Sequence, residues 1–114
     1  MLTEKEIGQA IRPICNRYGI NFAYLFGSYS RQENHQDSDV DLLIDTGEIT
    51  GYIKLFEFKH DLENQLGVGV DVVTMGTITP DGLFEHEIER DAKLLYVSDS
   101  FDGEVPYTTL KVMI

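Results

Sequence analysis

The chain has 114 residues and a mass of 13.0 kDa, which suits one compact domain around a single core and is too small for two. The composition, 42% hydrophobic and 25% charged, is typical of a folded domain, and nine basic against twenty acidic residues give a net charge of −11, so we expect no direct binding to nucleic acid. The single cysteine, Cys15, excludes a disulfide framework, and the lack of a bilayer-length apolar run or a secretory start predicts a cytoplasmic protein without a membrane segment.

The first segment has the pattern of a capped helix followed by a strand. Thr3 and Glu6 have the spacing of a capping box, and the apolar residues that follow at helical spacing predict a helix from about residue 4 to residue 18. Pro13 lies inside it and removes a hydrogen-bond donor, so we expect either a kink or two short helices. Aromatic and β-branched residues over 20–26 then predict a buried strand.

A second strand is predicted after a polar connection. Gly27 and Ser28 end the first strand, and a short helix is expected to continue through Arg31. The polar residues 32–38 predict a loop. Acidic and aliphatic residues alternate at the start of 39–44, which predicts a strand with its aspartates on one side.

The remaining segments alternate between helix and strand. We expect a helix over 52–66, a third strand over 68–73, a further helix that opens at Thr79-Pro80, and a fourth strand over 94–97. The predicted core stripe of the 52–66 helix consists of Tyr52, Leu55, Phe56, Leu62 and Leu66. The sequence therefore predicts an α/β (α+β) fold in which a small mixed sheet of about four strands is flanked by helices.

Three carboxylates lie on predicted strands that are otherwise aliphatic. Asp39 and Asp41 are two residues apart, so their side chains share one face of the second strand, about 6.5 to 7 Å apart. Such a pair is costly unless a cation compensates for the repulsion, and carboxylate oxygens favour Mg²⁺ or Mn²⁺. Asp71 is a third acid, on the third strand. If the second and third strands are neighbours, all three carboxylates can converge on metal.

A phosphate site is predicted next to these acids. Gly27 and Ser28 stand at a junction of strand and helix, where backbone N–H groups, a small hydroxyl and a positive helix end suit an anion. Arg31 can add a bidentate contact to a phosphate oxygen. Adjoining anion and cation sites are what nucleotide chemistry requires.

These residues resemble the motif of the DNA polymerase beta-like nucleotidyltransferase superfamily, and more closely that of its minimal nucleotidyltransferase branch. The family pattern of Gly-Ser, two acids one residue apart and a later third acid is met by Gly27-Ser28, Asp39-Val40-Asp41 and Asp71, and the finer pattern by Arg31 and Ser38. The resemblance covers roughly residues 20–97. Ser30 and Gln32 depart from it, because the family often has Ala and Gly there.

The resemblance implies catalytic and metal-binding roles for Asp39, Asp41 and Asp71, with two Mg²⁺ or Mn²⁺ ions expected. It also implies nucleotide binding by Gly27, Ser28, Arg31 and Ser38. The implied reaction is transfer of AMP from ATP to a hydroxyl acceptor, most economically a tyrosine of a HEPN-type toxin that this chain silences as an antitoxin. A small-molecule nucleotidyltransferase of the aminoglycoside type and an antitoxin that acts by binding alone are the alternatives.

A calcium loop is the alternative from another class of protein. Four acids have the spacing of positions 1, 3, 5 and 12 of an EF-hand: Asp37, Asp39, Asp41 and Glu48. However, Leu42 stands where the sharp turn requires glycine.

The C-terminal tail differs in character from the predicted catalytic domain, residues 1–97. Residues 98–114 begin with turn-forming residues and end in an apolar, β-prone segment. Such a terminus either packs back on its own sheet or adds a strand to a partner or to a second copy of the chain, and we favour the partner.

Overall fold

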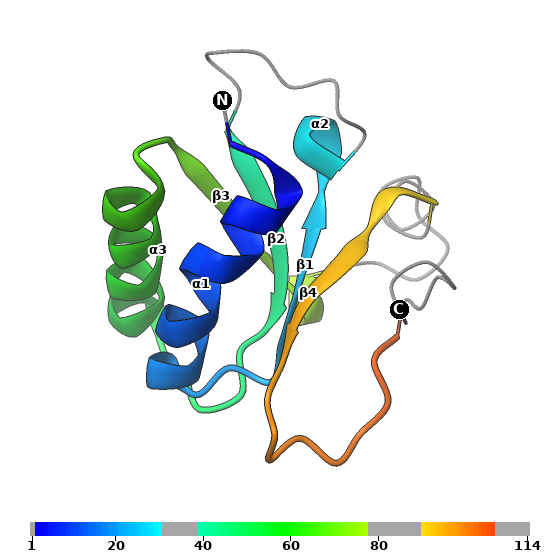
Figure 1. The fold of residues 1–114 in the computed structure, drawn as a ribbon. Coiled ribbons are helices and arrows are strands. Elements are labelled where there is room, and N and C mark those ends of the chain that lie inside the picture. The colour runs from blue at the N-terminus through cyan, green and yellow to red at the C-terminus, as the bar shows by residue number, and fades with distance from the viewer. Residues whose placement is uncertain (1, 31–38, 78–89, 107–114) are drawn as a thin grey trace.

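The computed structural model describes residues 2–30, 39–77 and 90–106 (Figure 1). Their elements, in chain order, are α1 (Glu4–Tyr18), β1 (Phe22–Phe26), α2 (Gly27–Ser30), β2 (Val40–Asp45), α3 (Tyr52–Leu66), β3 (Val70–Thr74), the short 3₁₀ helix η1 (Met75–Thr77) and β4 (Lys93–Val97). The predicted loop over 32–38, the helix expected to open at Thr79-Pro80 and residues 107–114 of the tail lie outside these ranges, wholly or in large part.

The four strands form one mixed sheet in the order β3-β2-β1-β4. β1 pairs antiparallel with both β2 and β4, whereas β2 and β3 run parallel. Parallel neighbours need a crossover connection, and α3 supplies it between β2 and β3. The predicted α+β class and the mixed sheet of four strands are confirmed.

The two faces of the sheet have different roles. α1 and α3 lie side by side on one face (Figure 1), where they enclose the larger core with Leu25 of β1 and with Val40, Leu42 and Ile44 of β2. The other face carries a smaller apolar cluster of Phe22, Tyr24, Phe26, Leu43 and Ala92. Because side chains alternate along a strand, the residues between Val40, Leu42 and Ile44 project to this second face.

α1 is a single helix that begins as its capping box predicts. The Thr3 backbone N–H donates to Glu6 Oε1 at 2.8 Å, and the Glu6 N–H donates to Thr3 Oγ1 at 3.1 Å. Pro13 lies within the helix, so the alternative of two short helices is wrong. The guanidinium of Arg12, the residue directly before Pro13, donates to the carbonyl of Leu95 and connects α1 to β4.

α3 has the predicted bounds but buries a different stripe. Phe58, Leu62 and Leu66 are buried, whereas Tyr52 and Phe56 are 81% and 67% exposed. Phe58, Leu62 and Leu66 are spaced by four residues and therefore share one helix face, from which Phe56 is turned away. The expectation that Tyr52 and Phe56 belong to the core is wrong.

The described part of the tail packs beside the smaller cluster. Phe101 makes an edge contact with Phe22, with 5.5 Å between ring centroids, and Val105 also packs there. Residues 98–106 form no strand, and the partner role predicted for the end of the tail remains a prediction. Among the described helices, none has the length and apolarity needed to cross a bilayer.

Cys15 is fully buried in the larger core, and this burial raises the pKa of its thiol to about 12. A thiol with that pKa carries almost no thiolate at neutral pH, and the thiolate is the reactive form. We therefore predict that a thiol reagent labels Cys15 only after unfolding, which a titration in native and denaturing buffer measures. Stoichiometric labelling of the native protein at pH 7 would contradict this packing.

Candidate active site

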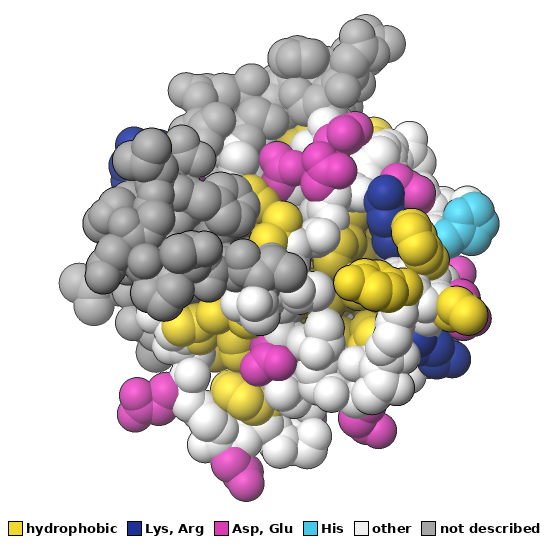
Figure 2. Space-filling model, turned by 180° about the vertical axis from the view of Figure 1, so that it is seen from behind, with side chains coloured by type: hydrophobic (Ala, Val, Ile, Leu, Met, Phe, Trp, Pro, Cys, Tyr) yellow, Lys and Arg dark blue, Asp and Glu magenta, His cyan; other side chains and the backbone are white. Residues whose placement is uncertain are grey.

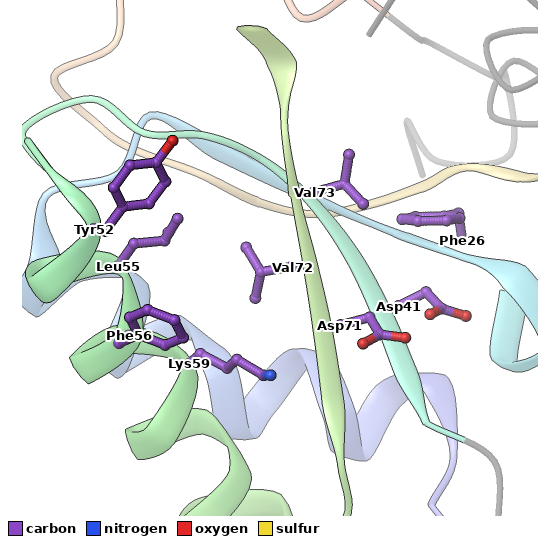
Figure 3. Close-up of a pocket in the computed structure, with 9 residues that line it drawn as sticks. All are labelled: Phe26, Asp41, Tyr52, Leu55, Phe56, Lys59, Asp71, Val72 and Val73. Atoms are coloured by element: carbon purple, nitrogen blue, oxygen red, sulfur yellow. The ribbon is translucent and has the colours of Figure 1, made fainter. Parts of the chain in front are cut away.

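Two carboxylates from neighbouring strands lie side by side on the face of the sheet opposite α1 and α3. Asp41 of β2 is the register partner of Asp71 in the parallel β3, so both side chains project to the same face from strands about 4.8 Å apart. Phe26 of β1 partners Asp41 on its other side. Figure 3 shows the two carboxylates together, with the ring of Phe26 beyond Asp41. β3 therefore neighbours β2, as convergence of the acids requires.

Asp39 lies at the entrance to β2, two residues before Asp41. Its carboxylate lies over Gly69, since a Cβ added to Gly69 would be 3.1 Å from Asp39 Cγ and still closer to its Oδ1. The N–H of Val40 donates to the carbonyl of Gly69 at 2.9 Å and holds the two strands together here. Gly69 thus leaves room for the Asp39 carboxylate, which any side chain at position 69 would displace.

The three carboxylates do not surround a common position. Within residues 2–30, 39–77 and 90–106, no group of three His, Cys, Asp or Glu side chains is arranged to hold a metal ion. The structure thus brings Asp41 and Asp71 together and leaves Asp39, which is exposed, at the rim. The donors nonetheless fit a hard divalent cation, because they are carboxylates on one sheet face whose repulsion a cation would relieve.

Gly27 brings the α2 turn against Asp41. Its φ is +72°, and a Cβ on it would collide with the Asp41 carboxylate, 3.0 Å from Cγ, so only glycine fits here. Ser30 is buried and its Oγ donates to the Gly27 carbonyl at 2.8 Å. Ser30, a departure from the family pattern, therefore braces the turn that places Gly27.

Three of the predicted nucleotide-binding contacts cannot be placed. Arg31 and Ser38 lie outside the described residues, as does the side chain of Ser28. Gly27 is the one predicted nucleotide-binding residue whose position beside the acids the structure gives.

A groove of about 480 Å³ runs from the two acids over β3 to α3 (Figure 3), and Val72 lies in its wall. Lys59 extends from α3 toward the strand and is the one basic residue among the described residues that line the groove. Sequence reasoning missed this groove because its aromatic residues on α3 fitted a core stripe. The described lining residues are Phe26, Asp41, Tyr52, Leu55, Phe56, Lys59, Asp71, Val72 and Val73.

The calcium-loop alternative is wrong. Residues 40–45 form a regular strand, where an EF-hand requires a sharply turning loop. Glu48, the twelfth position of that loop, lies against Gly19, which follows α1, and Asp41 lies against Gly27 at the other end of β1.

Comparison with known proteins agrees with this geometry. The family described as polymerase beta, nucleotidyltransferase matches residues 9–101. Protein adenylyltransferase MntA of Thermococcus cleftensis is 38% identical over 82 residues, which cover 68% of this chain and 83% of MntA. MJ0435 of Methanocaldococcus jannaschii, named a putative protein adenylyltransferase, is 41% identical over 75 residues. These residues cover 66% of this chain and 81% of MJ0435.

The fold is also found in a solved complex. A solved structure of a tri-AMPylated HEPN toxin of Shewanella oneidensis in complex with an MNT antitoxin contains a chain that matches with a TM-score of 0.62 and 20% identity, over 82% of this chain and 72% of the matched chain. At this identity the match shows the shared fold.

The position of Asp39 predicts a selective effect of Gly69→Ala. The added methyl group must push the Asp39 carboxylate away, so we expect about tenfold weaker binding of Mg²⁺ in the presence of a non-hydrolysable ATP analogue. Gly76→Ala is the matched control, since a Cβ there meets nothing within 4 Å. Calorimetric titration measures both variants, and equal weakening in the two would contradict a specific role for the Gly69 contact.

Proposed function

The chain belongs to the polymerase beta nucleotidyltransferase family, and we propose that it transfers AMP from ATP to a hydroxyl group of a partner protein, as the antitoxin of a HEPN-type toxin. Family membership makes the chain a nucleotidyltransferase. The observation that carries the proposal is the in-register pair of Asp41 and Asp71 beside the Gly27 turn. The acceptor is proposed to be a tyrosine.

The proposed reaction is an in-line displacement at the α-phosphorus of ATP. The acceptor oxygen forms a bond to the α-phosphorus, the bond to the oxygen that bridges to the β-phosphate breaks, and pyrophosphate leaves. Divalent cations, held by Asp39, Asp41 and Asp71 when bound, would neutralise the charge of the triphosphate. Mg²⁺ is the proposed ion, and Mn²⁺ suits the same ligands.

The residues of this chain have separate tasks in that reaction. Asp71 lies on the edge strand, exposed, and is proposed to accept the proton of the attacking hydroxyl. Gly27 lets the backbone approach the phosphates closely, and Ser28, Arg31 and Ser38 are proposed to bind them.

A protein acceptor is supported by the relatives and by charge. MntA is named a protein adenylyltransferase, and the AMPylated toxin in the solved complex is bound to an antitoxin of this fold. With a net charge of −11, this chain repels RNA and DNA as acceptors. The carboxylates at the three motif positions argue against an antitoxin that acts by binding alone, because masking a partner does not need them.

Asp41→Asn tests this proposal. We expect it to abolish transfer of AMP while the fold is retained, since the substitution relieves repulsion with Asp71. The measurement is incubation with ATP labelled at the α-phosphate, Mg²⁺ and a HEPN-type toxin as acceptor, followed by mass spectrometry of that toxin. Label at a tyrosine, with the mass increment of one or more AMP units, is the expected result.

Asp45→Asn is the matched control, because Asp45 projects to the same face at the far end of β2, opposite Phe22. It should transfer AMP at the wild-type rate. Label found on an added aminoglycoside and absent from the protein would replace the proposed acceptor, and no label from the wild type would favour the binding-only alternative.

A further inference from the structure

The groove beside the acids crosses an unpaired stretch of the sheet edge. β3 is the last strand of the sheet. The Val40 N–H donates to the Gly69 carbonyl, so Gly69 directs its backbone groups toward β2. Along a parallel strand this direction alternates from residue to residue, and the backbone N–H and C=O groups of Val70 and Val72 therefore point away from β2. Glu63 Oε2 accepts from the Val70 N–H at 3.0 Å. Over the described ranges, no hydrogen-bond partner is found for the outward N–H and C=O of Val72.

The α3 side of this edge is apolar and uncovered by any described residue. Tyr52 and Phe56 are 81% and 67% exposed, and with Leu55 they line the groove next to Val72. Figure 2, which shows the molecule from behind, has hydrophobic side chains exposed beside charged ones on this part of the surface. Exposed aromatic side chains that adjoin an open strand edge are typical of a surface that binds a partner.

We propose that the groove binds an extended segment of the acceptor protein, which pairs with Val72 at the outer edge of β3 and presents its hydroxyl group to Asp71. This inference rests on the proposed function and adds where and how the acceptor is recognised. Pairing of this kind supplies one donor and one acceptor from the segment to the free backbone groups of Val72.

Strand geometry determines which face each side chain of that segment points to, and therefore which residue types fit. Side chains alternate between faces, and Val72 projects toward α3. Asp71 projects to the opposite face of the sheet, here called the acid face because it also carries Asp41. A segment residue opposite Val72 would therefore lie against Tyr52 and Phe56. The residue next to it would lie on the acid face beside Asp71. We expect the modified hydroxyl residue to be directly adjacent in sequence to a large apolar residue.

Position favours a polypeptide over the nucleotide as occupant. The Gly27 turn lies at the β1 side of the acids, whereas the aromatic residues lie beyond β3, on the opposite side. The hollow beside the groove shares Phe56 and Lys59 with it and is also bordered by Glu57, His60 and Glu63, so this surface carries charges of both signs.

The test is steady-state transfer of AMP from labelled ATP to the HEPN-type protein, with the concentrations of acceptor and ATP varied separately. For the double variant Tyr52→Ala/Phe56→Ala we expect the KM for the acceptor to rise at least about tenfold, with the KM for ATP unchanged. Ile53→Ala is the matched control: Ile53 is 79% exposed on the same helix but does not line the groove. Its KM for the acceptor should equal that of the wild type.

A second pair of variants tests the backbone contact. Val72→Pro removes the outward N–H that the segment would use, whereas Val72→Ala retains it, so the KM for the acceptor should rise more in the proline variant. Thermal melting and Mg²⁺-dependent ATP binding must be retained in both for the comparison.

The outcomes separate this inference from the proposed function. If the wild type modifies the protein but the groove variants keep its KM, the inference is wrong and the proposed function stands. If the variants raise the KM for ATP instead, the groove holds the nucleotide and the inference is also wrong. If the wild type modifies only a small molecule, both are overturned.

Discussion

The site depends on the placement of two like charges in register on neighbouring strands. Asp41 and Asp71 repel each other, and the strand register places them together. That register is set from the opposite face, where Val40, Leu42 and Ile44 are completely buried beneath α1 and α3. A slip of one residue would turn the acids into the core and these apolar side chains out of it. Hydrophobic burial on one face thus maintains electrostatic strain on the other, where a divalent cation would relieve it.

Two glycines and one serine shape the space around these acids. Gly27 and Gly69 lie where a side chain would collide with the carboxylates of Asp41 and Asp39. Both acids thereby lie at the end of the sheet where β1 ends and β2 begins. Ser30 supports Gly27 through its carbonyl, which gives a structural reason for a residue that departs from the family pattern. Among the described residues, the groove leads from the acids across β3 to the exposed aromatic residues of α3.

Much of this arrangement follows from sequence pattern, and the exceptions have physical causes. The capping box of Thr3 and Glu6, the bounds of α3 and the shared face of Asp39 and Asp41 are local properties that the sequence determines. The adjacency of Asp71 to Asp41 depends on strand order, which no local pattern specifies. Helical spacing alone places Tyr52 and Phe56 in the core, but α3 has more apolar residues than its buried face needs, and these two line the groove instead. Arg31 and Ser38 lie outside the described residues and remain predictions from the motif.

Asp39, Asp41 and Asp71 are proposed to bind the divalent cations that accompany ATP. Paramagnetic Mn²⁺ can reveal this binding, since it broadens nuclear magnetic resonance signals close to its binding site. In the presence of a non-hydrolysable ATP analogue, the amide signals of residues 39–41, 69–71 and 26–27 should broaden first, at substoichiometric Mn²⁺. Broadening centred on other acids, such as Glu57 and Asp61 of α3, with these signals unaffected, would contradict the account.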